Sequence, residues 1–123
     1  MWCIEFDPQT RALTVRIAQQ ASVASLRALQ RKHVEALAAT AGEVFKVLVD
    51  LRALAPLGPD TAAVLSEIKR TESALPGYRG RAVLCDSATV AMQQRRTSLT
   101  DGTSDREIVT LDDLEAYAFL RGP

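Results

Sequence analysis

The sequence is poor in the residues on which most enzyme and metal chemistry depends. It has one histidine, His33, and two cysteines, Cys3 and Cys85. A lone histidine gives no basis for a catalytic triad or a multi-histidine metal site. No signal peptide precedes the cysteines, so we expect both to be reduced packing residues rather than a disulfide. The composition therefore predicts a non-enzyme that uses no metal and no cofactor.

Long apolar runs and an excess of charge of either sign are also absent. No segment approaches the roughly 18 apolar residues of a membrane span, and the N-terminus lacks the basic-then-apolar order of a signal peptide. Lysine plus arginine balance aspartate plus glutamate at fifteen each, so no overall field attracts nucleic acid or an anionic membrane. We expect a cytoplasmic protein with no membrane span and no nucleic-acid partner.

The chain is organised around a central strand and the loop that follows it. Its 123 residues suffice for one domain, 1–123, that buries a core without disulfides or metal. A run of branched apolar residues at 47–49 predicts a strand covered on both faces, which Asp50 ends. The Gly-Pro-Asp sequence at 58–60 has the chemistry of a helix start. Open α/β sheets usually bind what they recognise at such a strand-to-helix junction.

The rest of the chain alternates between strand and helix periodicity. The order predicts β-β-α-β-α-β-α-β-α, an α/β fold with a mixed, mostly parallel sheet covered by helices, mostly on one side. The expected strands are residues 2–7, 13–17, 47–49, 81–85 and 107–109, and the expected helices are residues 22–41, 59–73, 87–96 and a last one after a capping box at 110–113.

The spacing of apolar residues also predicts which helix faces are buried. Residues 97–105 are polar and predict a long mobile loop. The expected buried residues are Val23, Leu26, Val34, Leu37 and Ala41 in the first helix, Val64, Leu65 and Ile68 in the second, and Ala88, Ala91 and Met92 in the third.

This order, with a strand that ends in Asp50 and an irregular loop before a helix, resembles the STAS domain of bacterial anti-sigma-factor antagonists over nearly the whole chain. The segment 108–120, a strand, an acidic turn and then alanine with large apolar residues, is also similar to a broader bacterial group. That group lacks the phosphorylation motif and is likened to lipid-carrier (CRAL-TRIO) domains. The resemblance implies a STAS-like fold and a regulatory role.

The defining site of the STAS family is a strand aspartate followed by Asp-Ser-Ser/Thr-Gly and an apolar helix. When Asp50 is aligned with that first aspartate, Gly58 falls at the motif aspartate and Pro59 at the phosphorylated serine. Asp60 then falls at the next hydroxyl residue and Thr61 at the glycine. Proline has no hydroxyl, so the kinase-operated switch is not expected here. Asp60 either mimics a permanently phosphorylated state or simply complements the helix dipole.

The loop before the second helix is the expected partner-binding surface. Leu57 either exposes apolar surface to a partner or folds back as a staple over the helix start. The candidate binding residues are Pro56, Leu57, Gly58, Asp60 and Thr61.

Other candidate residues carry weaker indications. Arg95, Arg96 and Arg106 form the only basic concentration, which is either a solvated face or a contact for an acidic partner or phosphate. His33 is interpreted as a boundary residue beside the first helix's apolar stripe. Cys85 precedes a helix start, which favours a reactive thiolate, but burial in an apolar strand argues the opposite.

The main hypothesis is a non-catalytic bacterial STAS-like regulatory domain that binds another protein. The alternative is a small-molecule or lipid-binding domain, with an apolar ligand in a crevice between the helices of Leu26–Leu37 and Val64–Ile68. An enzyme is the third possibility. A homodimer is also compatible with the sequence, which does not name the partner.

Overall fold

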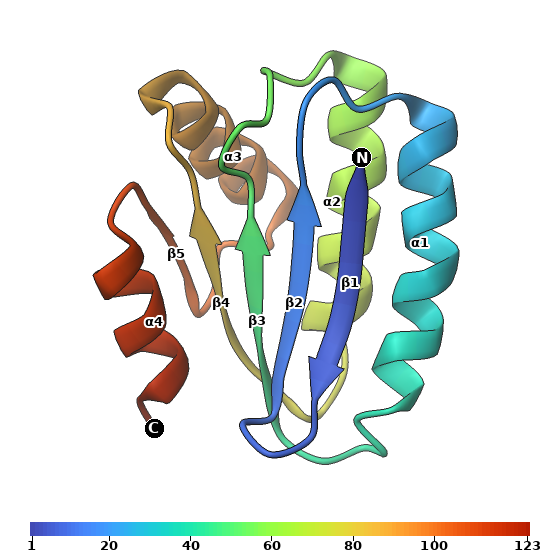
Figure 1. Ribbon diagram of the computed structural model, residues 1–123, viewed down its shortest axis with the longest axis vertical. Helices are drawn as coiled ribbons and strands as arrows, with labels where there is room; N and C mark the ends of the chain where they lie inside the picture. Colours follow the sequence, from blue (N-terminus) through green and yellow to red (C-terminus); the bar gives the residue numbers. More distant parts are fainter.

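The chain folds in the predicted order, with a hairpin followed by alternating helices and strands (Figure 1). The computed structural model describes residues 1–123. The strands are β1 (Trp2–Asp7), β2 (Ala12–Ile17), β3 (Phe45–Asp50), β4 (Tyr78–Leu84) and β5 (Glu107–Thr110). The helices are α1 (Val23–Ala38), α2 (Pro59–Ser73), α3 (Ala88–Asp101) and α4 (Asp113–Arg121).

The five strands form one mixed, mostly parallel sheet, which confirms the predicted fold class. The strand order is β1-β2-β3-β4-β5. β1 runs antiparallel to β2, and the other neighbours are parallel. The N–H of Arg11 donates to Asp7 O (2.8 Å) and closes the hairpin. β3 is therefore central, as the apolar run at 47–49 predicts.

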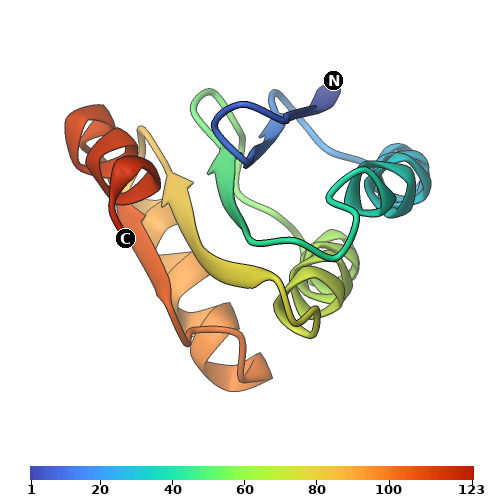
Figure 2. The same cartoon turned by 90° about the horizontal axis from the view of Figure 1, so that it is seen from below.

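Helices cover the two faces of the sheet unequally (Figure 2). On one face α1, α2 and α3 enclose the main core, which includes Val47, Val49, Val64, Leu65 and Ile68. On the other face α4 packs over β3, β4 and β5 around a smaller core. The second face of β1 and β2 is left without a helix, and its side chains are half-buried or exposed.

The buried stripe of α1 differs from the predicted one. Val23 and Val34 are exposed, whereas His33 is fully buried. His33 turns inward because Glu72 of α2 lies 2.7 Å from its Nε2 atom. The residues that α1 buries are Leu26, Leu29, His33 and Leu37.

The third helix is longer than predicted, and residues 97–101 belong to it rather than to a long loop. It ends where Gly102 adopts a left-handed conformation (φ 72°), which glycine does without steric cost. Its inner face includes the polar residues Gln94 and Ser98, while Ala88 and Met92 are exposed, so the prediction that they are buried is wrong. Because these inner residues are polar, the spacing of apolar residues did not predict the last turns of this helix.

Three smaller boundaries also differ from the predictions. α1 ends at Ala38 rather than at 41, and β4 begins at Tyr78 rather than at 81. The N-cap of α4 is Asp112, whose side chain accepts a hydrogen bond from Leu114 N–H. Thr110 instead accepts a hydrogen bond from Asp112 N–H through Oγ1 (3.0 Å).

Candidate functional site

Hydrogen bonds from the segments that follow β2 and β4 hold the loop between β3 and α2 in place. The N–H of Ala53 donates to the carboxylate of Asp86 (2.9 Å), which follows β4. Gln19, which follows β2, donates its N–H to Ala53 O (2.8 Å) and accepts from Ala55 N–H (3.0 Å) through its own carbonyl. The loop is therefore a fixed part of the rim formed by the carboxyl ends of the parallel strands.

Leu57 packs into the core instead of facing solvent. It is 8% exposed, and both of its backbone polar groups bind the side-chain amide of Gln93 on α3. Gln93 Oε1 accepts from Leu57 N–H (3.0 Å), and Gln93 Nε2 donates to Leu57 O (2.7 Å). Of the two alternatives for Leu57, its burial agrees with the one in which the side chain folds back over the helix start.

The start of α2 presents a small exposed surface. Gly58 is the N-cap and supplies no side-chain capping bond, and Pro59 occupies the first turn. Thr61 is half-buried, and its Oγ1 donates to Gly58 O (3.0 Å). The exposed residues of this surface are Pro56, Gly58, Pro59 and Asp60.

Asp50 is a buried carboxylate at the C-terminal end of β3. Its carboxylate accepts hydrogen bonds from the Arg52 backbone N–H and guanidinium (2.9–3.1 Å). Arg16 Nε lies 3.4 Å away. Burial raises the pKa of Asp50, but the hydrogen bonds and charges of the two arginines outweigh burial, so this pKa lies below its ordinary value. Asp50 therefore stays ionised and fixes the direction in which the loop leaves the sheet.

Two of the three arginines of the predicted basic patch make structural contacts, and these contacts are separate. Arg95 donates to Val109 O (2.8 Å). Arg106 donates to Tyr78 O (2.7 Å), stacks over the Tyr78 ring and lies 3.4 Å from Asp105. Arg96 is exposed on α3. These contacts favour a solvated, structural role for the patch over a dedicated phosphate site.

A hollow of about 990 Å³ lies on the half of the sheet that α4 leaves uncovered. Thr14 and Arg16 line it from β2, and Leu48, Tyr117 and Leu120 line its other side. This hollow is not the predicted crevice between α1 and α2. The apolar side chains of those two helices are buried together in the main core. This hollow therefore lies on the opposite face of the sheet from the predicted crevice.

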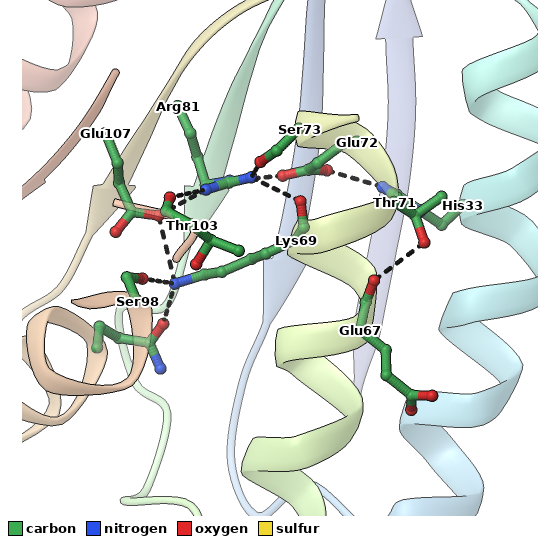
Figure 3. A network of polar contacts seen from close by, with 11 residues as sticks. His33, Glu67, Lys69, Thr71, Glu72, Ser73, Arg81, Ser98, Thr103 and Glu107 are labelled. Atoms are coloured by element: carbon green, nitrogen blue, oxygen red, sulfur yellow. Dashed lines mark hydrogen bonds and ion pairs between the residues drawn. The ribbon is translucent and has the colours of Figure 1, made fainter. Parts of the chain in front are cut away.

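A network of buried charges joins the helices to β4 and β5 (Figure 3). Arg81 is fully buried, and its Nε donates to Glu72 (2.6 Å). Glu72 also binds His33, and Arg81 also donates to Glu107 (2.7 Å). Burial raises the pKa of Glu72, but Arg81 and His33 outweigh burial and keep this pKa below its ordinary value. His33 is therefore a buried partner of a carboxylate and not the boundary residue predicted.

Lys69 extends the network toward α3. Its Nζ donates to Gln94 (2.7 Å) and Ser98 (3.0 Å) and lies 3.5 Å from Glu107. Burial lowers the pKa of Lys69, and Glu107 partly opposes that effect. Sequence reasoning missed this network. The sequence does contain one indication of it. Lys69 and Glu72 lie one helical turn after the apolar residues of α2, so they lie on the buried face of that helix.

The two cysteines have different surroundings. Cys85 is buried, and burial raises the pKa of its thiol to about 11. It is therefore protonated at neutral pH, which argues against a nucleophilic role. Cys3 is exposed on the uncovered face of β1 and is not the packing residue predicted. No cluster of histidine, cysteine and acidic residues is arranged to hold a metal ion, and none of the helices is long and apolar enough to cross a membrane.

Comparisons with known proteins identify the fold. The sequence matches no family model and no curated protein. The structure is similar to an anti-sigma factor antagonist from Mycobacterium paratuberculosis, with a TM-score of 0.65 and 15% identity over 99% of this chain and 94% of that one. It is also similar to the protein TM1081, with a TM-score of 0.67 and 14% identity over 100% of this chain and 90% of the other. The chain therefore has a STAS-like fold.

Proposed function

We propose that this protein is a non-catalytic bacterial regulatory domain that binds another protein through residues 55–61 and the exposed start of α2. The observation that carries the proposal is the exposed surface of Pro56, Gly58, Pro59 and Asp60, presented by a STAS-like fold. One structural neighbour is an anti-sigma factor antagonist, and we infer that this chain also acts through a protein partner.

The rigidity of the loop supports a binding role. Hydrogen bonds from Gln19, Asp86 and Gln93 hold its backbone in one conformation. A surface that is ordered before binding loses less conformational entropy when a partner docks. Because Pro59 also restricts the backbone at the start of α2, we expect residues 55–61 to bind a partner whose surface is complementary to this one conformation.

The chemistry of this surface favours binding without a phosphorylation switch. Pro59 stands at the position of the family's phosphorylated serine and has no hydroxyl. The Thr61 hydroxyl is already bonded to Gly58 O. Asp60 contributes a fixed negative charge in the first turn of α2.

The test is partner capture from the native bacterium by wild-type protein and two variants, followed by mass spectrometry. Asp60→Arg reverses the charge of the proposed surface. Glu35→Arg makes the same kind of change on exposed α1, far from the rim. A partner retained by wild type and Glu35→Arg but lost by Asp60→Arg, at equal unfolding midpoints, supports the proposal. Equal capture by all three proteins contradicts it.

The hollow on the uncovered sheet face favours a second candidate, the binding of a small ligand that has both apolar and polar groups, because Leu48, Tyr117 and Leu120 line it together with charged side chains. Its volume of about 990 Å³ is at the upper end of the range for small-molecule sites. Native mass spectrometry of the purified protein would detect a co-purifying ligand. Thr14→Trp would place a large side chain in the hollow and obstruct a ligand there. Loss of the added mass in that variant would place the ligand in the hollow, and a chain that carries no added mass would argue against this candidate.

A further inference from the structure

The outer edge of β1 is an unpaired strand edge. β1 pairs with β2 alone, and across that pair Ala18 N–H donates to Met1 O (2.9 Å). Hydrogen-bonded pairs alternate along an antiparallel ladder, so the backbone groups of the odd-numbered residues of β1 face β2. The even-numbered residues therefore direct their N–H and C=O groups away from the sheet. These residues are Trp2, Ile4 and Phe6.

The other edge strand of the sheet, β5, is protected against pairing with another strand, whereas β1 is not. β5 has only four residues. The guanidinium of Arg95 occupies Val109 O (2.8 Å), and Glu107 N–H donates to Ser104 O (3.2 Å). β1 has six residues with no proline, lysine or arginine among them, and its only charged side chains, Glu5 and Asp7, line the hollow on the uncovered face of the sheet. Natural sheets usually shield an exposed edge with such features unless another strand covers it.

We propose that β1 pairs with β1 of a second copy of this chain, antiparallel and about a two-fold axis through Ile4. The sheet then continues from one copy into the other, and the outward N–H and C=O groups of both edges are satisfied. α1 lies behind β1 on the helix-covered face (Figure 2), so the two α1 helices flank the same interface.

The apolar side chains of β1 fit this register. An axis through Ile4 places Ile4 opposite its own copy and Trp2 opposite Phe6 of the second copy, twice by symmetry. All three side chains are only half-buried in one chain. Cross-strand aromatic pairs are among the favourable pairs in antiparallel sheets. The interface therefore covers apolar surface that a single copy leaves partly exposed.

The positions of the acidic residues in β1 also favour the register with the axis through Ile4. With the axis through Ile4, Glu5 lies opposite Cys3 of the second copy and Asp7 lies opposite Met1, so no carboxylate directly faces another. An axis through Glu5 would oppose the two Glu5 carboxylates and would place Pro8, which has no N–H, in a hydrogen-bonding position. An axis through Cys3 would shorten the ladder by two residues.

Disulfide trapping tests the register. Residues 3 and 5 would face each other in a non-hydrogen-bonded pair, where Cα atoms are about 4.5 Å apart, within disulfide range. Oxidised glutathione should therefore convert Glu5→Cys into covalent dimers, because the new thiol faces Cys3 of the second copy. Glu5→Cys combined with Cys3→Ser should stay uncross-linked, as should Asp7→Cys. Cross-linking of the combined variant would place the axis at residue 5 and overturn the proposed register.

Sedimentation or light scattering tests dimer formation itself. Wild type should rise from 13.4 kDa toward twice that mass as concentration increases. Ile4→Pro removes an outward N–H without breaking the ladder to β2, so it should stay monomeric while circular dichroism shows a folded chain. Wild type that stays at 13.4 kDa together with absence of cross-linking in Glu5→Cys overturns the proposal. Because β1 is separate from residues 55–61, Ile4→Pro also shows whether partner capture depends on the dimer.

Discussion

Replacing Glu72 with glutamine tests whether the buried charge network holds α2 against the sheet. The substitution keeps the size of the side chain and removes its charge. Glu72 accepts hydrogen bonds from Arg81 (2.6 Å) and His33 (2.7 Å), and all three side chains are at most 1% exposed. The amide can still accept one of these bonds but cannot balance the Arg81 charge.

The expected cost follows from those contacts. Removing one partner of a buried ion pair costs about 3–5 kcal/mol, because the remaining charge stays buried without compensation. Glu107 still binds Arg81 at 2.7 Å, which favours the lower half of that range. Against a total stability of about 5–15 kcal/mol, such a loss is large. At roughly 4 °C per kcal/mol, the unfolding midpoint should fall by about 12–16 °C.

Glu67→Gln is the matched control on the same helix. Glu67 pairs with Arg27 at 2.6 Å, but both side chains are more than 40% exposed. An exposed pair contributes at most about 1 kcal/mol. Chemical denaturation of both variants gives the two free energies of unfolding. If Glu72→Gln costs no more than Glu67→Gln, the network does not hold the helix and the reasoning is wrong.

The pH dependence of unfolding gives an independent check. The pKa of Glu72 is lower in the folded protein than its ordinary value of 4.5. The unfolded chain therefore takes up the proton first, and the stabilisation from Glu72 is present above that value and is lost as pH falls through the folded pKa. Glu72→Gln has no such proton to take up. Its free energy of unfolding should fall less steeply than that of wild type below about pH 4.5.

Three further predictions concern the smaller core, the contact between β4 and α4, and the expected absence of a phosphorylation switch. Leu48→Ala should cost about 2–5 kcal/mol through lost apolar contact and a cavity under α4; a cost below about 1 kcal/mol in denaturant titration would contradict the central place of β3. Gly80→Ala should cost about 1–3 kcal/mol, because Gly80 has a positive φ of 146° that favours glycine and because an added Cβ would lie 2.7 Å from the Phe119 ring and 2.9 Å from a backbone oxygen. Gly58→Ala, whose Cβ meets nothing within 4 Å, is the thermal-unfolding control; equal losses would show that the close contact is not the cause. Incubation with an anti-sigma kinase should leave residues 58–61 unmodified, and phosphate found on Thr61 by mass spectrometry would contradict the absence of a switch at this loop.

Local sequence features determined the order of elements. Burial follows from simple local patterns in three places. The first two strands alternate apolar and polar residues, residues 47–49 form a continuous apolar run, and α2 has apolar residues at helical spacing. The start of α2 was equally predictable, because proline and aspartate have strong preferences for the first helical turn. The STAS-like fold followed from this order, and the comparisons confirm it.

Tertiary structure decided where polar and isolated side chains lie. His33 and Lys69 are buried only because Glu72 and Glu107 reach them from other elements, and hydrophobic spacing treats all four as surface residues. Leu57 is buried because the Gln93 amide on α3 binds its backbone on both sides. Such contacts join residues far apart in the sequence, so no local pattern reports them. The sequence by itself determined the frame of the fold, and the packed structure decided which side chains remain available to a partner, because only packing shows which polar groups find partners inside.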